Sequence, residues 1–491
     1  MWPSCTAKPF APVIPSVPRD LQHGKQPDER ESLHSHRSGD TTSSSFVVCS
    51  TSALFFLRVS YLEARTVLHP FHHRLARTMK LIKLIPLLLI LPTFVFMGCQ
   101  SADSSDGSQA TAPSTSDRAE ELAQQHIIVD GHIDVPYRLL DFREDIADST
   151  FGGDFDYPRA KAGGLDAPFM SIYLPVELQD TPGASKARAE ELIDLIEGIA
   201  DEHPDKFEVA TSPDDVRRIA EAGKIALPMG MENGSGLEDD LANVAHFYDR
   251  GIRYITLTHA KHNRIGDSSY DQEDDRWNGL SPFGEEVIAE MNRLGMMVDI
   301  SHVTDPTANA VLDITEAPVI ASHSSCRHFT PGWERNMSDE LIRAVGENGG
   351  VVMINFGSSF LKSEYQGDDD PIREQIDAYL EENNIEEGSA EAVRYTEQVR
   401  KANPIGTLDD VADHIDRAVE LAGIDHVGLG SDYDGVFGLP EGLQDASTYP
   451  NLIAELLERG YSEEDIQKIL GGNALRVWEE VEQVAQTLQQ D

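Results

Sequence analysis

The chain has 491 residues, of which 40% are hydrophobic and 25% are charged, a composition typical of a folded globular protein and not of a disordered one. This length suits one large α/β barrel or two ordinary domains. The formal net charge of −45 argues against nucleic acid as a partner, because the phosphates would be repelled. A solvated acidic surface and an electric field that steers a substrate would each account for this charge.

The charge is divided unevenly along the chain. Residues 1–98 carry 11 Lys and Arg against 6 Asp and Glu, whereas residues 99–491 carry 29 against 79. Residues 1–78 have no clear periodicity and are rich in Ser, Pro and His. We therefore predict that 1–78 are a non-native or disordered N-terminal extension and that Met79 would serve as the true start.

Residues 79–98 and the cysteine that follows read MKLIKLIPLLLILPTFVFMGC. Lys80 and Lys83 form a basic start, and an apolar core that is short for a membrane-spanning helix follows. This segment resembles the signal of a bacterial lipoprotein, in which the cysteine is lipidated. The resemblance implies that a lipid on Cys99 anchors the protein to the bacterial membrane, on the periplasmic side or the cell surface. The alternative is an uncleaved N-terminal anchor.

A polar stretch separates this segment from the folded part. Residues 99–117 are rich in Ser, Ala and Asp and have no apolar surface to bury, so we expect a flexible tether. The folded part is expected to span 118–491. It contains one cysteine, Cys326, which excludes an internal disulfide bond there. Cys326 could be a nucleophile or a ligand, but we expect a small apolar filler.

Eight short apolar runs follow one another in the folded part, most of them bounded by Gly, Pro, Asp or polar residues. They are HIIVDGHID (126–134), APFMSIYLP (167–175), KIALPMGMEN (224–233), IRYITLTHA (252–260), GMMVDISHV (295–303), APVIASHSS (317–325), GGVVMINFG (349–357) and DHVGLGSDYDG (425–435). Near-continuous apolar runs are typical of parallel strands buried on both faces. Helical patterns such as 186–203 and 282–295 separate most of them. The alternation predicts a (β/α)8 TIM barrel.

Residues 358–410 do not fit this alternation. They contain DDDPIREQIDAYLEENNIEEGSAEAVRYTEQVRK, an acidic helical pattern between the seventh and eighth runs. We predict a helical insertion there, which would serve as a lid or as the surface of a dimer. Residues 449–490 are expected to close the barrel with helices.

Side chains that bind metals gather where the predicted strands end. They are His132, Asp134, Glu232, His259, His302, His323, Asp432 and Asp434. A single histidine in such a place is usually structural, and GSDYDG alone would be read as a turn. However, the C-terminal ends of barrel strands meet at one mouth, and buried ionisable groups are rare unless they are paired or bound to metal. Since residues i and i+2 of a strand face the same side, His132 and Asp134 can share one metal.

The number of these side chains bears on the kind of metal site. Three or four histidines with two carboxylates suit a borderline divalent ion, for which zinc is the default. This is more than one tetrahedral ion needs, so we predict two zinc ions bridged by a carboxylate and a hydroxide. Six further histidines fall outside this pattern and are predicted to be structural: His126, His246, His262, His328, His414 and His426.

Seven motifs in order resemble one known family. DGHIDVPYRL, MENGSG, YITLTHAKHNRIGDSS, DISHV, VIASHSSCRHFTPGWERNMSDE, VGLGSDYDGV and GGNALRVW, over about residues 120–480, are similar to the renal-type membrane dipeptidases. These are zinc dipeptidases of the amidohydrolase superfamily. The resemblance implies that His132 and Asp134 ligate the first zinc ion and that His302 and His323 ligate the second. It also implies that Glu232 bridges both ions.

The same resemblance implies roles toward a dipeptide substrate. His259 would contact the carbonyl oxygen, and Arg335 would hold the C-terminal carboxylate. Without the resemblance, Arg335 would be read as part of a surface salt bridge. Asp432 would lie near the bridging water and the scissile nitrogen, with Asp434 as the alternative for that role. Family members are often dimers, which implies a homodimer as a further expectation.

The expected chemistry follows from charge. Two zinc ions lower the pKa of a bridging water to about 7, so a hydroxide is present at neutral pH to attack the peptide carbonyl. His259 and the metal would stabilise the oxyanion, and Asp432 would carry the proton from the water to the leaving amine. The alternatives are a lactonase, a phosphotriesterase or a deaminase on the same barrel and, less favoured, a binding lipoprotein without catalytic activity.

Overall fold

The computed structural model of the chain describes residues 114–271 and 275–490. The predicted N-terminal extension (1–78), signal segment (79–98) and lipidated Cys99 lie outside these residues. Within them, no helix combines the length and the apolar composition that crossing a bilayer requires.

The first described helix, α1 (Thr115–Gln125), begins inside the segment that was expected to be a tether. The cause is a capping box. The Ser114 side chain accepts from the N–H of Asp117, and the Asp117 carboxylate accepts from the N–H of Ser114. These bonds satisfy N–H groups that have no partner within the helix. The helix therefore begins three residues before the predicted boundary at Arg118.

Eight parallel strands close into a barrel in the order β1-β10-β9-β8-β7-β6-β5-β2. The strands are β1 (Ile128–Ile133), β2 (Leu165–Tyr173), β5 (Met229–Glu232), β6 (Ile252–Thr256), β7 (Met297–Asp299), β8 (Ile320–Ala321), β9 (Val351–Ile354) and β10 (Val427–Leu429). Each of the eight apolar runs supplies one strand of the barrel, and nearly all residues of these strands are buried. The predicted (β/α)8 TIM barrel is confirmed.

The third apolar run holds two strands instead of one. Its first half, β4 (Ile225–Leu227), pairs with β3 (Phe207–Val209) in a separate two-stranded parallel sheet, and only β5 belongs to the barrel. Pro228 lies between β4 and β5 and has no N–H to donate, while its carbonyl accepts from the N–H of Met170 on β2. The strand β3 was not predicted, because a pairing segment of three residues leaves almost no periodic signal.

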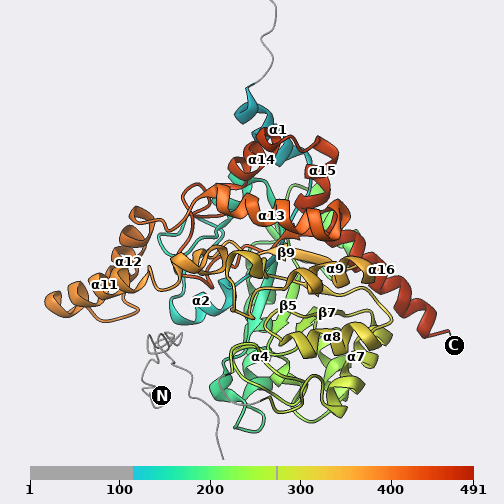
Figure 1. The fold of residues 1–491 in the computed structure, drawn as a ribbon. Helices are drawn as coiled ribbons and strands as arrows, with labels where there is room; N and C mark the ends of the chain where they lie inside the picture. The colour runs from blue at the N-terminus through green and yellow to red at the C-terminus, as the bar shows by residue number, and fades with distance from the viewer. Residues whose placement is uncertain (1–113, 272–274, 491) are drawn as a thin grey trace, which may run out of the picture. The chain divides into compact units, whose positions relative to one another are not determined.

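Helices surround the barrel and connect its strands (Figure 1). They are α2 (Val135–Asp141), α3 (Tyr157–Gly163), α4 (Ala184–Glu202), α5 (Pro213–Glu221), α6 (Ala242–Asp249), α7 (Pro282–Leu294), α8 (Asp305–Ile314), α9 (Asp339–Asn348), α13 (Leu408–Ala422), α14 (Tyr449–Arg459), α15 (Glu463–Gln467) and α16 (Asn473–Leu488). The last three, α14 to α16, are the helices that were expected after the eighth strand.

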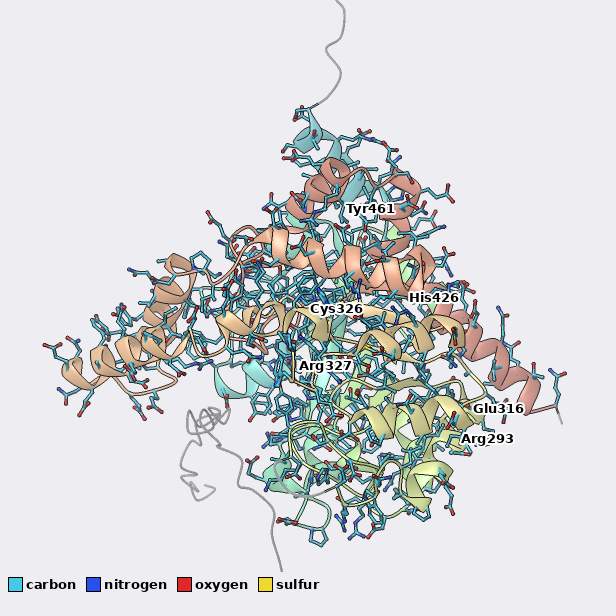
Figure 2. All side chains as sticks on the ribbon, in the orientation of Figure 1. Arg293, Glu316, Cys326, Arg327, His426 and Tyr461 are labelled. Atoms are coloured by element: carbon cyan, nitrogen blue, oxygen red, sulfur yellow. The ribbon has the colours of Figure 1, made fainter. Side chains whose placement is uncertain are left out.

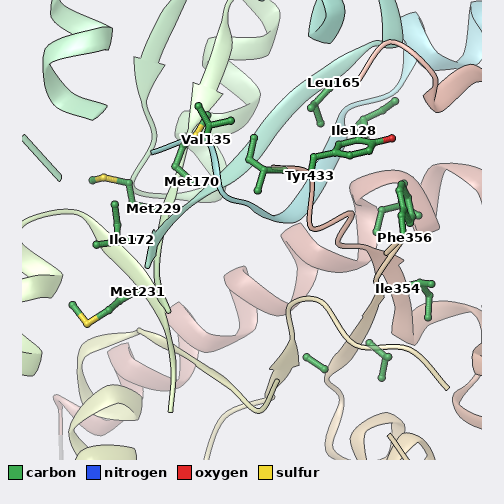
Figure 3. Close-up of a cluster of buried hydrophobic side chains, with 14 of the residues drawn as sticks. Ile128, Val135, Leu165, Met170, Ile172, Met229, Met231, Ile354, Phe356 and Tyr433 are labelled. Carbon is green, nitrogen blue, oxygen red and sulfur yellow. The ribbon is translucent and has the colours of Figure 1, made fainter. Parts of the chain in front are cut away.

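Alternate residues of the strands pack into two separate hydrophobic clusters. Met170 and Ile172 of β2, together with Met229 of β5, belong to the larger cluster (Figure 3). Tyr254 of β6 belongs to the smaller cluster, together with Trp478 of α16. This alternation follows from the period of two along a strand. The hydroxyl of buried Tyr254 hydrogen-bonds to a histidine described below, so the smaller cluster lies next to the polar site.

The insertion between β9 and β10 is helical, as predicted. It comprises α10 (Ser358–Leu361), α11 (Asp370–Asn383) and α12 (Ala390–Ala402), and Figure 1 shows α11 and α12 side by side, away from the barrel strands. These two helices have a small cluster of their own around Leu380 and Val399. They belong to the same compact unit as the barrel, and the chain continues from α12 into α13.

Candidate metal centre

The end of β1 places two candidate ligands side by side. His132 lies on the strand and is fully buried, and Asp134 follows it as the residue that precedes α2. Nε2 of His132 lies 3.5 Å from Oδ2 of Asp134. The i and i+2 spacing therefore brings both side chains to one side, as expected.

Glu232, the last residue of β5, lies among four histidines from four other strand ends. Its Oε1 atom lies 3.1 Å from Nε2 of His302, 3.4 Å from Nε2 of His323 and 3.6 Å from Nε2 of His259. Its Oε2 atom lies 3.4 Å from Nε2 of His132. Burial by itself would raise the pKa of Glu232, but the attraction of His132 and His259 holds it well below its usual value. The carboxylate is therefore ionised and faces all four rings.

His302 and His323 present their Nε2 atoms to each other at 2.8 Å. Burial is the main reason that the pKa of each ring lies well below its usual value, and the positive charge of nearby Arg335 adds to it. At this distance only one of the two facing nitrogens can have a proton, so at least one of them presents a lone pair. A divalent cation would satisfy both lone pairs at once.

Asp432 joins His132 and Asp134 in a third group of possible ligands, whose donor atoms all lie within 4.8 Å of one another. Its Oδ2 atom accepts from Nδ2 of Asn355 at 2.8 Å. Burial, with repulsion from Asp134, raises the pKa of Asp432 to about 8. A carboxyl group with such a pKa can both accept and release a proton near neutral pH.

Asp434, the alternative to Asp432, points elsewhere. Its Oδ2 atom accepts from Nε of Arg138 at 2.9 Å, and its Oδ1 atom accepts from the N–H of Asp154 at 2.6 Å. It lies in none of the groups of metal-binding side chains found among the described residues. The carboxylate of Asp434 therefore pairs with neighbouring loops, away from the three groups of candidate ligands.

Backbone strain marks the same loops. His302 has φ 68°, Asp432 has φ 63° and Asp434 has φ 67°, in the left-handed region that side chains other than glycine rarely adopt. Each such residue costs about 1–3 kcal/mol, and such strain persists only where the surrounding structure imposes it. Strain of this kind clusters at functional sites, in agreement with the position of His302 and Asp432.

Arg335 is buried beside the histidines, with 2% of its surface exposed, so it is not part of a surface salt bridge. Nη1 donates to Oγ of Ser324 at 2.8 Å, and Nη2 donates to the carbonyl oxygen of His323 at 2.8 Å. Nη2 also lies 3.1 Å from Nε2 of His302. A guanidinium in this position places a positive charge at the edge of the candidate metal centre.

The donor set fits divalent metal ions. Three groups of side chains meet the spacing of a metal site, and they share Glu232 or His132: His132–Glu232–His323, Glu232–His259–His302 and His132–Asp134–Asp432. Among the described residues, Nε2 of His132 and Oδ1 of Asp134 are buried without a hydrogen-bond partner. Buried polar atoms are nearly always satisfied in native proteins, so these two atoms fit the role of ligands to a cation.

Residues 116–491 match the family model of the membrane dipeptidases, peptidase family M19. The chain belongs to the membrane dipeptidase family. A probable dipeptidase, PvdM, from Pseudomonas aeruginosa is 29% identical with a TM-score of 0.64, and the match covers 76% of this chain and 99% of that one. A metallopeptidase from Rhodobacter sphaeroides, bound to a phosphinate mimic of L-Ala-D-Ala, is 25% identical with a TM-score of 0.59, covering 72% and 99%.

The fold and the type of enzyme follow from these matches. An amidohydrolase from Pseudomonas aeruginosa, 24% identical with a TM-score of 0.56 over 74% of this chain and 98% of that one, shares the fold. This membrane dipeptidase is therefore a metal-dependent peptidase on a (β/α)8 barrel, as the sequence motifs predicted.

Two residues of this membrane dipeptidase show the limits of sequence reasoning. Asn355, which holds Asp432, was missed because the run GGVVMINFG ends in no metal-binding group; its position directly after β9 was the available signal. Cys326 lies beside α13 (Figure 2), where its N–H donates to Nδ1 of His414 at 2.9 Å. Burial raises the pKa of the Cys326 thiol to about 12, which suits a packing residue and not a nucleophile.

Proposed function

We propose that this protein hydrolyses dipeptides with two zinc ions bound at the barrel mouth. His132 and Asp134 would hold one ion, and His302 and His323 would hold the other. Glu232 would bind both. The observation that carries the proposal is the position of Glu232, whose Oε2 atom faces His132 while its Oε1 atom faces His302 and His323. One carboxylate between two sets of ligands is the arrangement that a pair of ions requires.

The bound ions would supply a water of lowered pKa and polarisation of the substrate carbonyl. The protein supplies the proton transfers. Asp432 can accept a proton at its carboxylate and return it to the nitrogen of the leaving amine, because its carboxylate lies beside the proposed ligands His132 and Asp134. His259, whose ring packs edge-on against Tyr173 with centroids 4.8 Å apart, would contact the carbonyl oxygen and stabilise its developing charge.

Arg335 would select the substrate. Its buried guanidinium carries a positive charge, and its Nε atom has no hydrogen-bond partner among the described residues, so this N–H can donate to a carboxylate; such charge-assisted pairs are strong where water is excluded. A free C-terminus close to the cleaved bond is the substrate group that fits this position. The substrate class is therefore dipeptides and not internal segments of longer chains.

Removal of the metal tests the proposal. Dialysis against a strong chelator is expected to abolish hydrolysis of a dipeptide panel, and added zinc is expected to restore it to the original rate with two ions bound per chain. Metal content and initial rates are measured on the same samples. A metal-free preparation that retains full activity would defeat the proposal.

We also propose that the protein is anchored outside the cytoplasm by a lipid on Cys99. The support is the basic and apolar segment 79–98 that ends at this cysteine. Mass spectrometry of the mature N-terminus is expected to find Cys99 as the first residue with attached acyl chains. An N-terminus upstream of Cys99 would favour the uncleaved anchor instead. Homodimer formation stays a prediction, with α11 and α12 as the candidate surface.

A further inference from the structure

A hydroxyl group holds the ring of His323 on the side away from Glu232. Nε2 of His323 faces Glu232, and its Nδ1 atom lies 2.7 Å from Oγ of Ser322. The same Ser322 hydroxyl donates to Oδ2 of Asp299 at 2.7 Å. A hydroxyl has only one proton to donate, so Ser322 can act toward His323 only as an acceptor. The ring must then carry its proton on Nδ1, which leaves a lone pair on Nε2.

Asp299 is a buried carboxylate that accepts hydrogen bonds at both of its oxygen atoms. It ends β7 and is fully buried. Oδ1 accepts from the backbone N–H groups of Ser301 at 3.0 Å and Ser322 at 2.9 Å. Oδ2 accepts from the hydroxyls of Thr256 at 2.5 Å and Ser322 at 2.7 Å. All four hydrogen bonds are donated to Asp299, and the one from Ser322 directs the hydroxyl proton away from His323.

His132 is held by the same device on another strand. Its Nδ1 atom lies 2.8 Å from Oη of Tyr254, and this hydroxyl donates to the carbonyl oxygen of Gly131 at 3.1 Å. Tyr254 can therefore only accept from His132, so the neutral ring has its proton on Nδ1 and its lone pair on Nε2. That Nε2 atom is one of the buried atoms without a partner among the described residues. Two rings of the centre are thus fixed in the tautomer that binds metal through Nε2.

We propose that Asp299 is a positioning residue that acts through the Ser322 hydroxyl to keep His323 in its metal-binding tautomer. This inference rests on the proposed function, because it takes His323 as a metal ligand. Outer groups that orient a histidine ligand affect metal affinity by about 10- to 100-fold. Here a hydroxyl stands between carboxylate and ring, so the direction of its proton depends on Asp299.

The variant Asp299→Asn is expected to reverse the direction in which the Ser322 hydroxyl points its proton. Two backbone N–H groups point at Oδ1, so the amide oxygen of the new side chain must occupy that place and its NH2 group the place of Oδ2. The NH2 group then donates to Ser322, whose proton turns to Nδ1 of His323. The proton of the ring moves to Nε2 and blocks the lone pair. Zinc affinity is expected to fall about 100-fold.

The variant Ser322→Ala provides the matched comparison. It removes the hydroxyl and leaves His323 free to adopt either tautomer, so a smaller loss of about 10-fold is expected. The double variant Asp299→Asn/Ser322→Ala should return to the affinity of Ser322→Ala, because the amide no longer reaches the ring. A role for Asp299 in folding alone would leave the double variant no better than Asp299→Asn.

Zinc affinity is measured on metal-free full-length protein by competition with a chromophoric chelator, and the proton position on His323 is measured by nitrogen NMR of the ring. Asp156→Asn, which removes a buried carboxylate that caps α3, should lower thermal stability and leave zinc affinity unchanged. Equal affinity in Asp299→Asn and the unmodified protein would overturn the inference. If Asp299→Asn does not fold, an unchanged affinity in Ser322→Ala would overturn it. An unmodified protein that takes up no zinc would instead overturn the proposed function.

Discussion

Glu232→Gln is expected to lower kcat/KM for dipeptides by about 10³-fold or more and to remove most of the bound metal. The loss of several kcal/mol of metal-derived stabilisation corresponds to a factor of this size. The amide keeps the shape of the side chain but removes the negative charge that lies between His132 on one side and His302 on the other. A neutral oxygen cannot balance two divalent ions at this place.

The measurement is metal content by elemental analysis together with steady-state rates on the same preparation. Glu397→Gln is the matched control, because this largely buried glutamate of α12 pairs with Arg400 at 3.0 Å, outside the proposed centre. The control should bind metal and cleave dipeptides like the unmodified protein. Full metal content and an unchanged kcat/KM in Glu232→Gln would show that Glu232 does not hold the ions.

Arg335→Ala is expected to lower kcat/KM for dipeptides by about 10³-fold while metal content stays unchanged. Removing one partner of a buried charge pair costs about 3–5 kcal/mol, and each 1.4 kcal/mol corresponds to about a factor of ten. The decisive comparison is a dipeptide and the same dipeptide with a C-terminal amide. The unmodified protein should prefer the free acid strongly, and the variant should have lost that preference.

Arg293→Ala serves as the control, since Arg293 lies on α7 (Figure 2) and pairs with Glu290 at 2.6 Å, away from the candidate centre. It should keep the preference for the free acid. Arg335→Lys retains the charge without the fork and should fall between the unmodified protein and Arg335→Ala. If Arg335→Ala left kcat/KM on the best substrate intact, a lactonase, phosphotriesterase or deaminase would fit better, because such substrates carry no carboxylate to hold.

The sequence was sufficient for the barrel and for most of the residues that meet at its mouth. The apolar runs encode burial on both faces of each strand, and the barrel geometry brings all strand ends together, so Glu232 and His323 could be expected to meet. It was less informative where one run served two sheets. Pro228 divides the run from Ile225 to Glu232, and only the pairing partners show that its first half lies outside the barrel.

What the sequence alone determined is the local content of this protein: where strands lie, and that His132 and Asp134 share one side. Only the tertiary structure separates Asp432 from Asp434, because Asp432 lies with His132 and Asp134 whereas the carboxylate of Asp434 accepts from Arg138. The tertiary structure also showed that Ser322 links Asp299 to Nδ1 of His323. The physical reason is that periodicity reports burial along one segment, whereas the direction of a side chain after a strand depends on hydrogen bonds to residues distant in sequence.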